Sequence, residues 1–320
     1  MKKKVIFFIK SHFNQRDYDR FGIEILLDND FDVQVWDFTQ FLTNDAYKKV
    51  APPDPIKWSG CRVFKKKDEA VAAISDLERS SVIVSLLSYD LQGLSIYRAI
   101  SKNRLFYCTQ AFALPISASP LRQRLTKKIT NFTLDKLLMR IFLMTPINIL
   151  GVRPADLVIV VAEKHLPAAA PVSAGTKKLW VHNLDYDLFL KTADVASTVE
   201  KNRAVFLDQY LPFHPDSVYS GVKSIINPEE YYGALRRFFD YIEDKYGVDI
   251  VIAAHPRANY EDMPDLFGRR EVIRGKTVEL VRDAGFVIAH NSVAINFAIL
   301  FRKPILFLTS GKIIACHDLS

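Results

Sequence analysis

Short apolar runs alternate with amphipathic stretches along the first 190 residues of the chain. Runs rich in Val, Ile and Phe are typical of buried strands, and apolar residues three and four positions apart are typical of helices packed on one face. Strands separated by helix-length segments predict βαβ units with a parallel sheet. We expect strands at 4–9, 32–38, 81–87, 104–109, 157–162 and 177–183, and helices at 19–29, 68–79 and 91–102.

A polar segment of small residues, KTADVASTVEKN at 191–202, interrupts this pattern and predicts a linker. A second series of alternating elements follows it. Strands are expected at 203–208, 248–254, 271–274, 286–289 and 304–309, and helices at 228–245, 277–283 and 293–301. The sequence therefore predicts an α/β protein of two Rossmann-like domains, at 1–190 and 203–320, with mostly parallel sheets and a cleft between them.

The tripeptide His255-Pro256-Arg257 directly follows an apolar run that reads as a buried strand. Ligands of open α/β sheets bind outside the carboxyl ends of the strands. Proline biases the preceding histidine toward an extended backbone, and His and Arg side chains both donate hydrogen bonds to phosphoryl oxygens. We predict that these three residues bind phosphate, with a loop histidine in a structural hydrogen bond as the alternative.

A second strand end, at His290-Asn291-Ser292, leads into an expected helix that starts with Val293. Ser292 suits the N-cap position, and the N–H groups of Ser292 and Val293 would be available to a phosphate at a helix start. His290 and Asn291 are included in the predicted phosphate site. The alternative is that Ser292 only caps the helix and His290 is only a neighbour.

Asp208 and Gln209 end the first strand of the second series. A carboxylate at that position could act as a general base toward an acceptor hydroxyl, or it could simply cap a turn. His214, in the loop that follows, could line the same cleft.

The loop after the first strand carries His12, Asn14 and Arg16, which could contact a donor or an acceptor. This loop contains no GxGxxG and the chain contains no GxxxxGK[ST], which disfavours a dinucleotide enzyme and a P-loop triphosphatase.

Charge is unevenly distributed along the chain. Residues 1–190 carry 27 Lys/Arg and 19 Asp/Glu, whereas 191–320 carry 16 and 17. The segment 120–153 combines basic residues with Leu, Ile, Phe and Met, which predicts either an amphipathic helix at an anionic membrane surface or a helical hairpin packed on the sheet. Few aromatic residues are interleaved with the basic ones, so we do not expect a nucleic-acid partner.

The remaining composition predicts a metal-free protein of the cytoplasm. Cys61, Cys108 and Cys316 are far apart and lack metal-ligand spacing, and His182, Asp185 and Asp187 have no further ligand nearby. The apolar run at the N-terminus is too short for a signal peptide, and no run is long enough to span a bilayer. We expect a cytoplasmic protein, with peripheral attachment to the inner face of the cytoplasmic membrane as the alternative.

On these motifs, residues 203–310 resemble the nucleotide-binding half of GT-B glycosyltransferases that build bacterial surface polysaccharides such as capsule and lipopolysaccharide. HPR at 255–257 and NSVA at 291–294 resemble the HP and serine motifs of the sialyltransferase, polysialyltransferase and Kdo transferase group. The run at 291–307 is also similar to CDP-glycerol polymerases of teichoic-acid synthesis. Unlike the sialyltransferase, polysialyltransferase and Kdo transferase group, the chain has no D/E-D/E-G motif, and Asn291 precedes Ser292 where that group commonly has a second serine.

The resemblance implies an inverting, metal-independent glycosyltransferase. His255 of the HP motif would be catalytic, because it would bind the phosphate of a nucleotide sugar and aid the departure of the leaving group. Ser292 would bind the same phosphate and Asp208 would be the base, with a CMP-sugar favoured as the donor. The acceptor would be a surface polysaccharide or a lipid-linked glycan. The alternatives are a CDP-glycerol glycerophosphotransferase, a nucleotide-sugar 2-epimerase and a non-catalytic glycan- or membrane-binding scaffold. GT-B chains usually continue beyond the last strand seen here, so a second domain truncated at its C-terminus is also expected.

Overall fold

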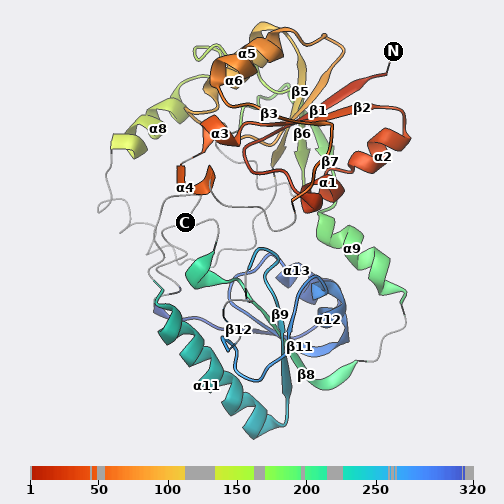
Figure 1. Cartoon of the computed structure of the whole chain (residues 1–320), viewed down its shortest axis with the longest axis vertical. Coiled ribbons are helices and arrows are strands. Elements are labelled where there is room, and N and C mark those ends of the chain that lie inside the picture. The colour runs from red at the N-terminus through yellow and green to blue at the C-terminus, as the bar shows by residue number, and fades with distance from the viewer. Residues whose placement is uncertain are drawn as a thin grey trace. The chain divides into compact units, whose positions relative to one another are not determined.

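The computed structural model of the chain describes residues 2–43, 45–48, 55–111, 134–161, 170–195, 199–214, 226–258, 260, 263, 265–311 and 313. The chain divides into two compact units, Met1–Val181 and His182–Ser320. Each unit is an α/β structure around one sheet whose paired strands are all parallel (Figure 1). The predicted α/β class, with two units built on parallel sheets, is therefore confirmed.

In the first unit, the described strands form a seven-stranded sheet in the order β3-β2-β1-β4-β5-β6-β7. The strands are β1 (Lys4–Ile9), β2 (Asp32–Asp37), β3 (Cys61–Val63), β4 (Val82–Ser85), β5 (Phe106–Ala111), β6 (Leu157–Val160) and β7 (Lys177–Trp180). The helices are α1 (Gln15–Arg20), α2 (Ile23–Asp28), α3 (Thr39–Leu42), α4 (Asp45–Lys48), α5 (Lys67–Ser75), α6 (Leu94–Lys102) and α8 (Leu134–Met144).

Alternation along β1 supplies apolar side chains to both faces of this sheet. Ile6 and Phe8 join the core that α5 and α6 cover, while Val5 and Phe7 join the core on the opposite face, where Ile23 of α2 packs. A strand buried on both faces reads as a continuous apolar run, which explains why KVIFFI could be recognised from sequence.

In the second unit, the described strands form a five-stranded sheet in the order β10-β9-β8-β11-β12. The strands are β8 (Glu200–Leu207), β9 (Asp249–Ala253), β10 (Val272–Ile273), β11 (Ala284–Ala289) and β12 (Ile305–Phe307). The helices are α9 (Leu184–Ala193), the short 3₁₀ helix η1 (Leu211–Phe213), α11 (Pro228–Tyr246), α12 (Thr277–Asp283) and α13 (Ile295–Leu300).

The central strand β8 also divides its side chains between two cores. Ala204 and Phe206 pack with α11, whereas Val205 and Leu207 pack with α12 and α13. The helix α11 begins at Pro228 behind Asn227, whose side chain accepts a hydrogen bond from the N–H of Glu230, and it ends at Gly247 in the left-handed region at φ 61°. These are the start and stop signals that made this helix predictable.

Some elements differ from the sequence expectations. The expected helix at 19–29 is two helices, α1 and α2, which Gly22 separates with a φ of 62°. The expected linker at 191–202 is partly regular structure, because α9 continues to Ala193 and β8 begins at Glu200. The division between units falls before α9, since that helix packs on α12 and α13. Of the expected basic segment at 120–153, residues 120–133 lie outside the described part, as does Cys316.

Each sheet has a point at which the strand order reverses. From β1 the chain proceeds to β2 and β3 on one side and returns to β4 on the other, and from β8 it proceeds to β9 and β10 and returns to β11. Crevices at the carboxyl ends of such neighbouring strands are the usual ligand sites of open α/β sheets. In the second unit this point lies between the ends of β8 and β11, where Gln209 and Asn291 stand.

Candidate functional site

Asp208 and Gln209, the two residues that follow β8, hold the loops that follow both neighbouring strands. Successive residues of an extended chain point to opposite sides. Asp208 lies on the α11 side of the sheet, where it interacts with Tyr231 and Tyr260, and Gln209 reaches the turn after β11. One dipeptide at the end of the central strand therefore holds the loops that follow β9 and β11.

The carboxylate of Asp208 secures the loop after β9 through Tyr260. One oxygen accepts from the N–H of Tyr210 at 3.0 Å, and the other accepts from the Tyr260 hydroxyl. The Tyr260 oxygen in turn accepts from the N–H of His255 at 3.1 Å. This chain of hydrogen bonds ties the main chain of His255 to the end of β8.

Burial raises the pKa of Asp208 from 3.8 to about 6, although the hydrogen bonds from Tyr260 and from the N–H groups of Tyr210 and Gln209 oppose the shift. The residue is only 5% exposed. A raised pKa suits a general base, but the geometry does not, because both oxygens already accept hydrogen bonds inside the protein. Of the two roles considered for Asp208 from the sequence, the contact with the N–H of Tyr210 matches the turn-capping one, and the general-base role stays a prediction.

Both the oxygen and the nitrogen of the Gln209 side-chain amide form hydrogen bonds with the loop after β11. Its carbonyl oxygen accepts from the N–H of Asn291 at 3.0 Å, and its amide nitrogen donates to the carbonyl oxygen of the same residue. This paired contact closes the junction between β8 and β11, the point at which the strand order reverses. Gln209 was predicted as a cleft residue, and its side chain holds the main chain of another predicted site residue.

The imidazole of His255 is oriented by its own loop. The N–H of Arg257 donates to Nδ1 of His255 at 3.2 Å, so the neutral ring carries its proton on Nε2. Pro256 is exposed between them, and both His255 and Arg257 are half-buried. The His214 ring lies 5.0 Å from the His255 ring, centroid to centroid. The structure thus brings together two of the predicted site residues, His214 and His255.

The turn after β11 presents main-chain N–H groups. Ser292 does not occupy the N-cap position that the sequence suggested, because α13 begins two residues later than expected and Ala294 precedes it. The Ser292 hydroxyl accepts instead from the N–H of Ala294 at 3.2 Å. Within the described residues, no group accepts a hydrogen bond from the N–H of Ser292 or Val293.

His290 has a structural environment. It is 6% exposed, its Nδ1 lies 2.8 Å from the carbonyl oxygen of Leu308, and its Nε2 lies 2.9 Å from the Tyr231 hydroxyl. A carbonyl only accepts, so Nδ1 donates, and in the neutral ring Nε2 accepts from Tyr231. Both ring nitrogens are used within the protein, and the predicted phosphate contact of His290 is not supported by this geometry.

In the first unit, the loop after β1 carries the predicted residues His12, Asn14 and Arg16. The Asn14 side chain caps α1 by accepting from the N–H of Asp17 at 3.0 Å, so it serves the helix. His12 is half-buried and interacts electrostatically with Asp37 at the end of β2, and Arg16 is exposed. Burial raises the pKa of Asp37, which also accepts from the N–H of Thr39 at 2.7 Å.

Two residues of these sites were not anticipated from the sequence. Tyr260 lies five positions beyond His255 in a polar loop, and Asp37 ends an expected strand without a neighbouring motif. An acidic residue at the carboxyl end of a predicted strand is the signal that could have identified Asp37. Among the described residues, no group of three or more His, Cys, Asp or Glu could hold a metal ion, and none of their helices is long and apolar enough to cross a membrane.

Comparisons with known proteins give structural similarity without sequence relatives. No family model matches the chain, and no curated protein matches it. Among solved structures, a UDP-GlcNAc 2-epimerase from Methanocaldococcus jannaschii aligns over 99% of this chain and 92% of its own, with a TM-score of 0.47 and 12% identity.

Two other solved structures are similar to the same degree. The calicheamicin glycosyltransferase CalG4 aligns over 99% of this chain and 84% of its own, at a TM-score of 0.46 and 11% identity. The Anabaena protein Alr3699/HepE in complex with UDP-glucose aligns over 98% and 82%, at a TM-score of 0.47 and 13% identity.

Proposed function

We propose that the protein is a glycosyltransferase whose second unit binds the phosphate of a nucleotide-sugar donor at the carboxyl edge of its sheet. The observation that carries the proposal is the pair of fixed loops around β8. One presents His255 and Arg257, and the other presents the N–H groups of Ser292 and Val293. All four are hydrogen-bond donors, and donors are what a phosphate requires.

The spacing of these loops suits a nucleotide. They follow β9 and β11, which flank β8 on its two sides. Neighbouring strands are about 4.8 Å apart, so the loops emerge about 10 Å from each other. A phosphate bound near one loop leaves room for the ribose or the sugar to extend toward the other.

In this proposal the site stabilises the leaving nucleotide. The acceptor hydroxyl oxygen bonds to the anomeric carbon and passes its proton to water. As the bond between that carbon and the phosphate oxygen breaks, negative charge grows on the phosphate oxygen. Nε2–H of His255 and the Arg257 guanidinium donate to the phosphate, and the N–H groups after β11 add fixed dipoles. Because these donors are already oriented by the loops, little rearrangement opposes the reaction. The chemistry requires no metal, since cationic and N–H donors supply the charge stabilisation.

We assign Asp208 to positioning in this mechanism. Its buried carboxylate holds Tyr260, and Tyr260 holds the main chain of His255. Loss of Asp208 would therefore impair the donor site by moving the loop that carries His255 and Arg257.

The finer assignment is a CMP-sugar donor, an inverting reaction and a polysaccharide or lipid-linked acceptor. The HPR and NSVA motifs support the donor class, and Ser292 and Val293 of the second motif do present N–H groups. The basic surplus of residues 1–190 supports an anionic acceptor or an anionic membrane face on the cytoplasmic side.

Thermal-shift measurements with CMP, CDP, UDP and GDP test the donor site. We expect stabilisation by CMP in the wild type, and loss of that shift in His255→Ala and Arg257→Ala. His182→Ala is the matched control, because His182 lies in the same unit and contacts Tyr186 instead. Hydrolysis of a CMP-sugar in the absence of an acceptor should likewise be lost in His255→Ala and Arg257→Ala and retained in His182→Ala.

The other outcomes of this screen separate the alternatives. Stabilisation by CDP together with consumption of CDP-glycerol would indicate the glycerophosphotransferase. Stabilisation by UDP with interconversion of a UDP-sugar would indicate the epimerase. Absence of any nucleotide effect in the wild type would refute the donor site and favour a scaffold.

A further inference from the structure

A glycine stands inside the long helix α11 where packing does not require one. Gly233 lies within a helix of 19 residues, and glycine lowers helix stability compared with alanine. A Cβ added there would meet Nη1 of Arg237 at 3.6 Å and Nη2 of Arg236 at 3.9 Å, which are ordinary contacts with flexible side chains. The glycine therefore leaves the main chain of α11 uncovered beside these two side chains.

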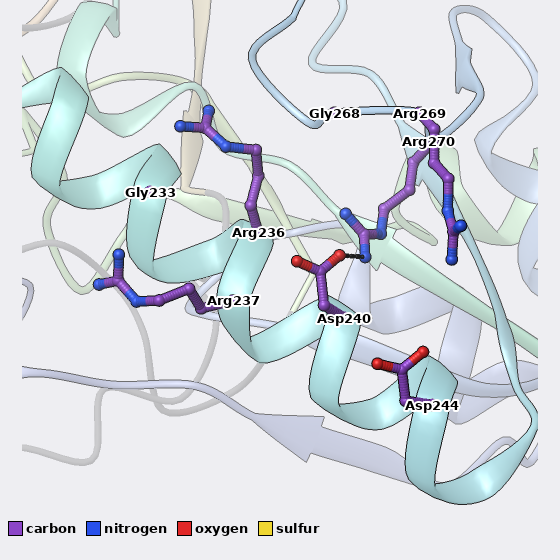
Figure 2. Close-up of a pocket in the computed structure, with 8 residues that line it drawn as sticks. All are labelled: Gly233, Arg236, Arg237, Asp240, Asp244, Gly268, Arg269 and Arg270. Atoms are coloured by element: carbon purple, nitrogen blue, oxygen red, sulfur yellow. Dashed lines mark hydrogen bonds and ion pairs between the residues drawn. The ribbon is translucent and has the colours of Figure 1, made fainter.

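Two guanidinium groups flank the open space over this glycine (Figure 2). Arg236 and Arg237 follow Gly233 by three and four positions, and long side chains on a helix point back toward its N-terminus. Arg236 also donates to the carbonyl oxygens of Leu266 at 3.0 Å and Asp265 at 3.4 Å. In the described part of the chain, neither arginine forms an ion pair with a carboxylate.

Two of the nearby acidic residues are paired with other arginines. Arg270, whose side chain is 3% exposed, contacts Asp240 at 2.6 Å and Glu243 at 2.7 Å, and Arg269 lies 3.5 Å from Glu243. Asp244 forms no ion pair within the described residues. The four arginines therefore face three carboxylates, which leaves one positive charge in excess.

These groups line a hollow of about 660 Å³ on α11 and the turn before β10. The lining residues are Gly233, Arg236, Arg237, Asp240, Asp244, Gly268, Arg269 and Arg270, and none of them belongs to the donor site. The hollow is open to solvent along the exposed side of α11, which a ligand could approach directly.

We propose that this hollow binds a phosphoryl group over Gly233. Nη1 of Arg237 and Nη2 of Arg236 lie 3.6 Å and 3.9 Å from the position that a Cβ of residue 233 would take, so the two guanidinium groups stand beside the bare main chain of Gly233. A phosphoryl group lying over this glycine would accept charge-assisted hydrogen bonds from both, and a large side chain at 233 would project into the space it occupies. The phosphoryl group could belong to a phospholipid head group or to a soluble phosphate compound, because the recognising chemistry is the same.

Binding of two probes to the full-length protein distinguishes these sources. Pyrophosphate is titrated by calorimetry, and vesicles of phosphatidylglycerol in phosphatidylcholine are tested by co-sedimentation. Binding of pyrophosphate alone indicates a soluble ligand, and preferential binding of the vesicles indicates a head group. If the wild type binds neither probe, the proposal is wrong.

Three variants locate the binding. Arg236→Ala/Arg237→Ala should weaken it at least tenfold, about the effect expected of a lost charge-assisted pair. Lys201→Ala/Lys276→Ala, which removes two exposed charges from the same unit, should leave it unchanged. Gly233→Leu keeps every charge and should raise the melting temperature, yet it should also weaken binding at least tenfold.

The Gly233→Leu result separates a built site from general attraction. If this variant binds like the wild type, the phosphoryl group does not sit over Gly233 and the proposal fails. Nucleotide shifts should be the same in all three variants, so failure here is distinct from failure of the proposed glycosyltransferase activity.

Discussion

Replacing Tyr260 with phenylalanine tests the connection between β8 and the His255 loop. The ring remains in its place against Tyr210 and Phe267, so packing is retained. Only the hydroxyl is lost, which donates to Asp208 and accepts from the N–H of His255. The substitution is therefore a deletion of two hydrogen bonds from one chain of contacts.

The free-energy cost of losing the hydroxyl can be worked out from these two hydrogen bonds. A hydrogen bond to a charged group contributes about 1.5–3 kcal/mol and a neutral one about 0.5–1.5 kcal/mol. The loop that carries His255 should open more easily by about 3 kcal/mol, which is a factor of about 100 in an equilibrium constant. The pKa of Asp208 should rise further, because the Tyr260 hydroxyl is the foremost group that lowers it.

Hydrogen exchange followed by mass spectrometry measures this opening directly. Peptides that cover β9 and the His255 loop should exchange about 100-fold faster in Tyr260→Phe than in the wild type. All three tryptophans, Trp36, Trp58 and Trp180, lie in the first unit, so their fluorescence reports on that unit separately. The fluorescence-detected unfolding of the first unit should not change.

Tyr246→Phe is the matched control, since Tyr246 is 60% exposed at the end of α11 and should change exchange and stability little. Unaltered exchange at His255 in Tyr260→Phe would refute the view that Asp208 secures this loop. Faster exchange throughout the second unit would mean that the hydroxyl supports global stability and has no local role.

Three further predictions concern the same unit. Burial raises the pKa of Asp208 in the folded state from 3.8 to about 6, so its contribution to the free energy of unfolding is complete below about pH 4 and is lost as the pH rises through 6. Denaturation followed by near-UV circular dichroism should show that the free energy of unfolding declines by about 3 kcal/mol over this range, and Asp208→Asn should abolish the decline. Gln209→Leu removes both contacts to Asn291 and should weaken nucleotide binding in calorimetry about tenfold, because the loop after β11 is released, whereas equal affinity would contradict its role. Arg270→Met leaves Glu243 without its buried partner and should lower the free energy of unfolding by about 3–5 kcal/mol, measured by urea denaturation; a neutral effect would show that the pair is replaceable by apolar packing.

The sequence predicts the strands and their ends well, because strands buried on both faces are long apolar runs. KVIFFI is the whole of β1, and FVIA lies within β11. The short strand β3 could not be predicted in this way, because two of its three residues are exposed. It forms by pairing with β2. Its existence depends on a neighbour that is distant in the sequence.

The candidate site is predictable to a different extent. Position at a strand end identifies Asp208, Gln209 and His255, since local pattern fixes where each strand stops. Their roles depend on long-range contacts, such as that between Gln209 and Asn291, which are 82 positions apart. Burial of the carboxylate and its contact with Tyr260 are also tertiary effects, and the positioning role proposed for Asp208 rests on them.

The residues that hold the candidate site in shape are different from the residues that its loops present to solvent. Asp208 and Gln209 shape the two loops from within the protein, while Arg257 and Val293 stand on those loops nearer to solvent. Substitutions on the loops can therefore change the chemistry that they present without disturbing the framework beneath. Variation of the proposed donor site would accordingly change the loop positions and keep the dipeptide intact.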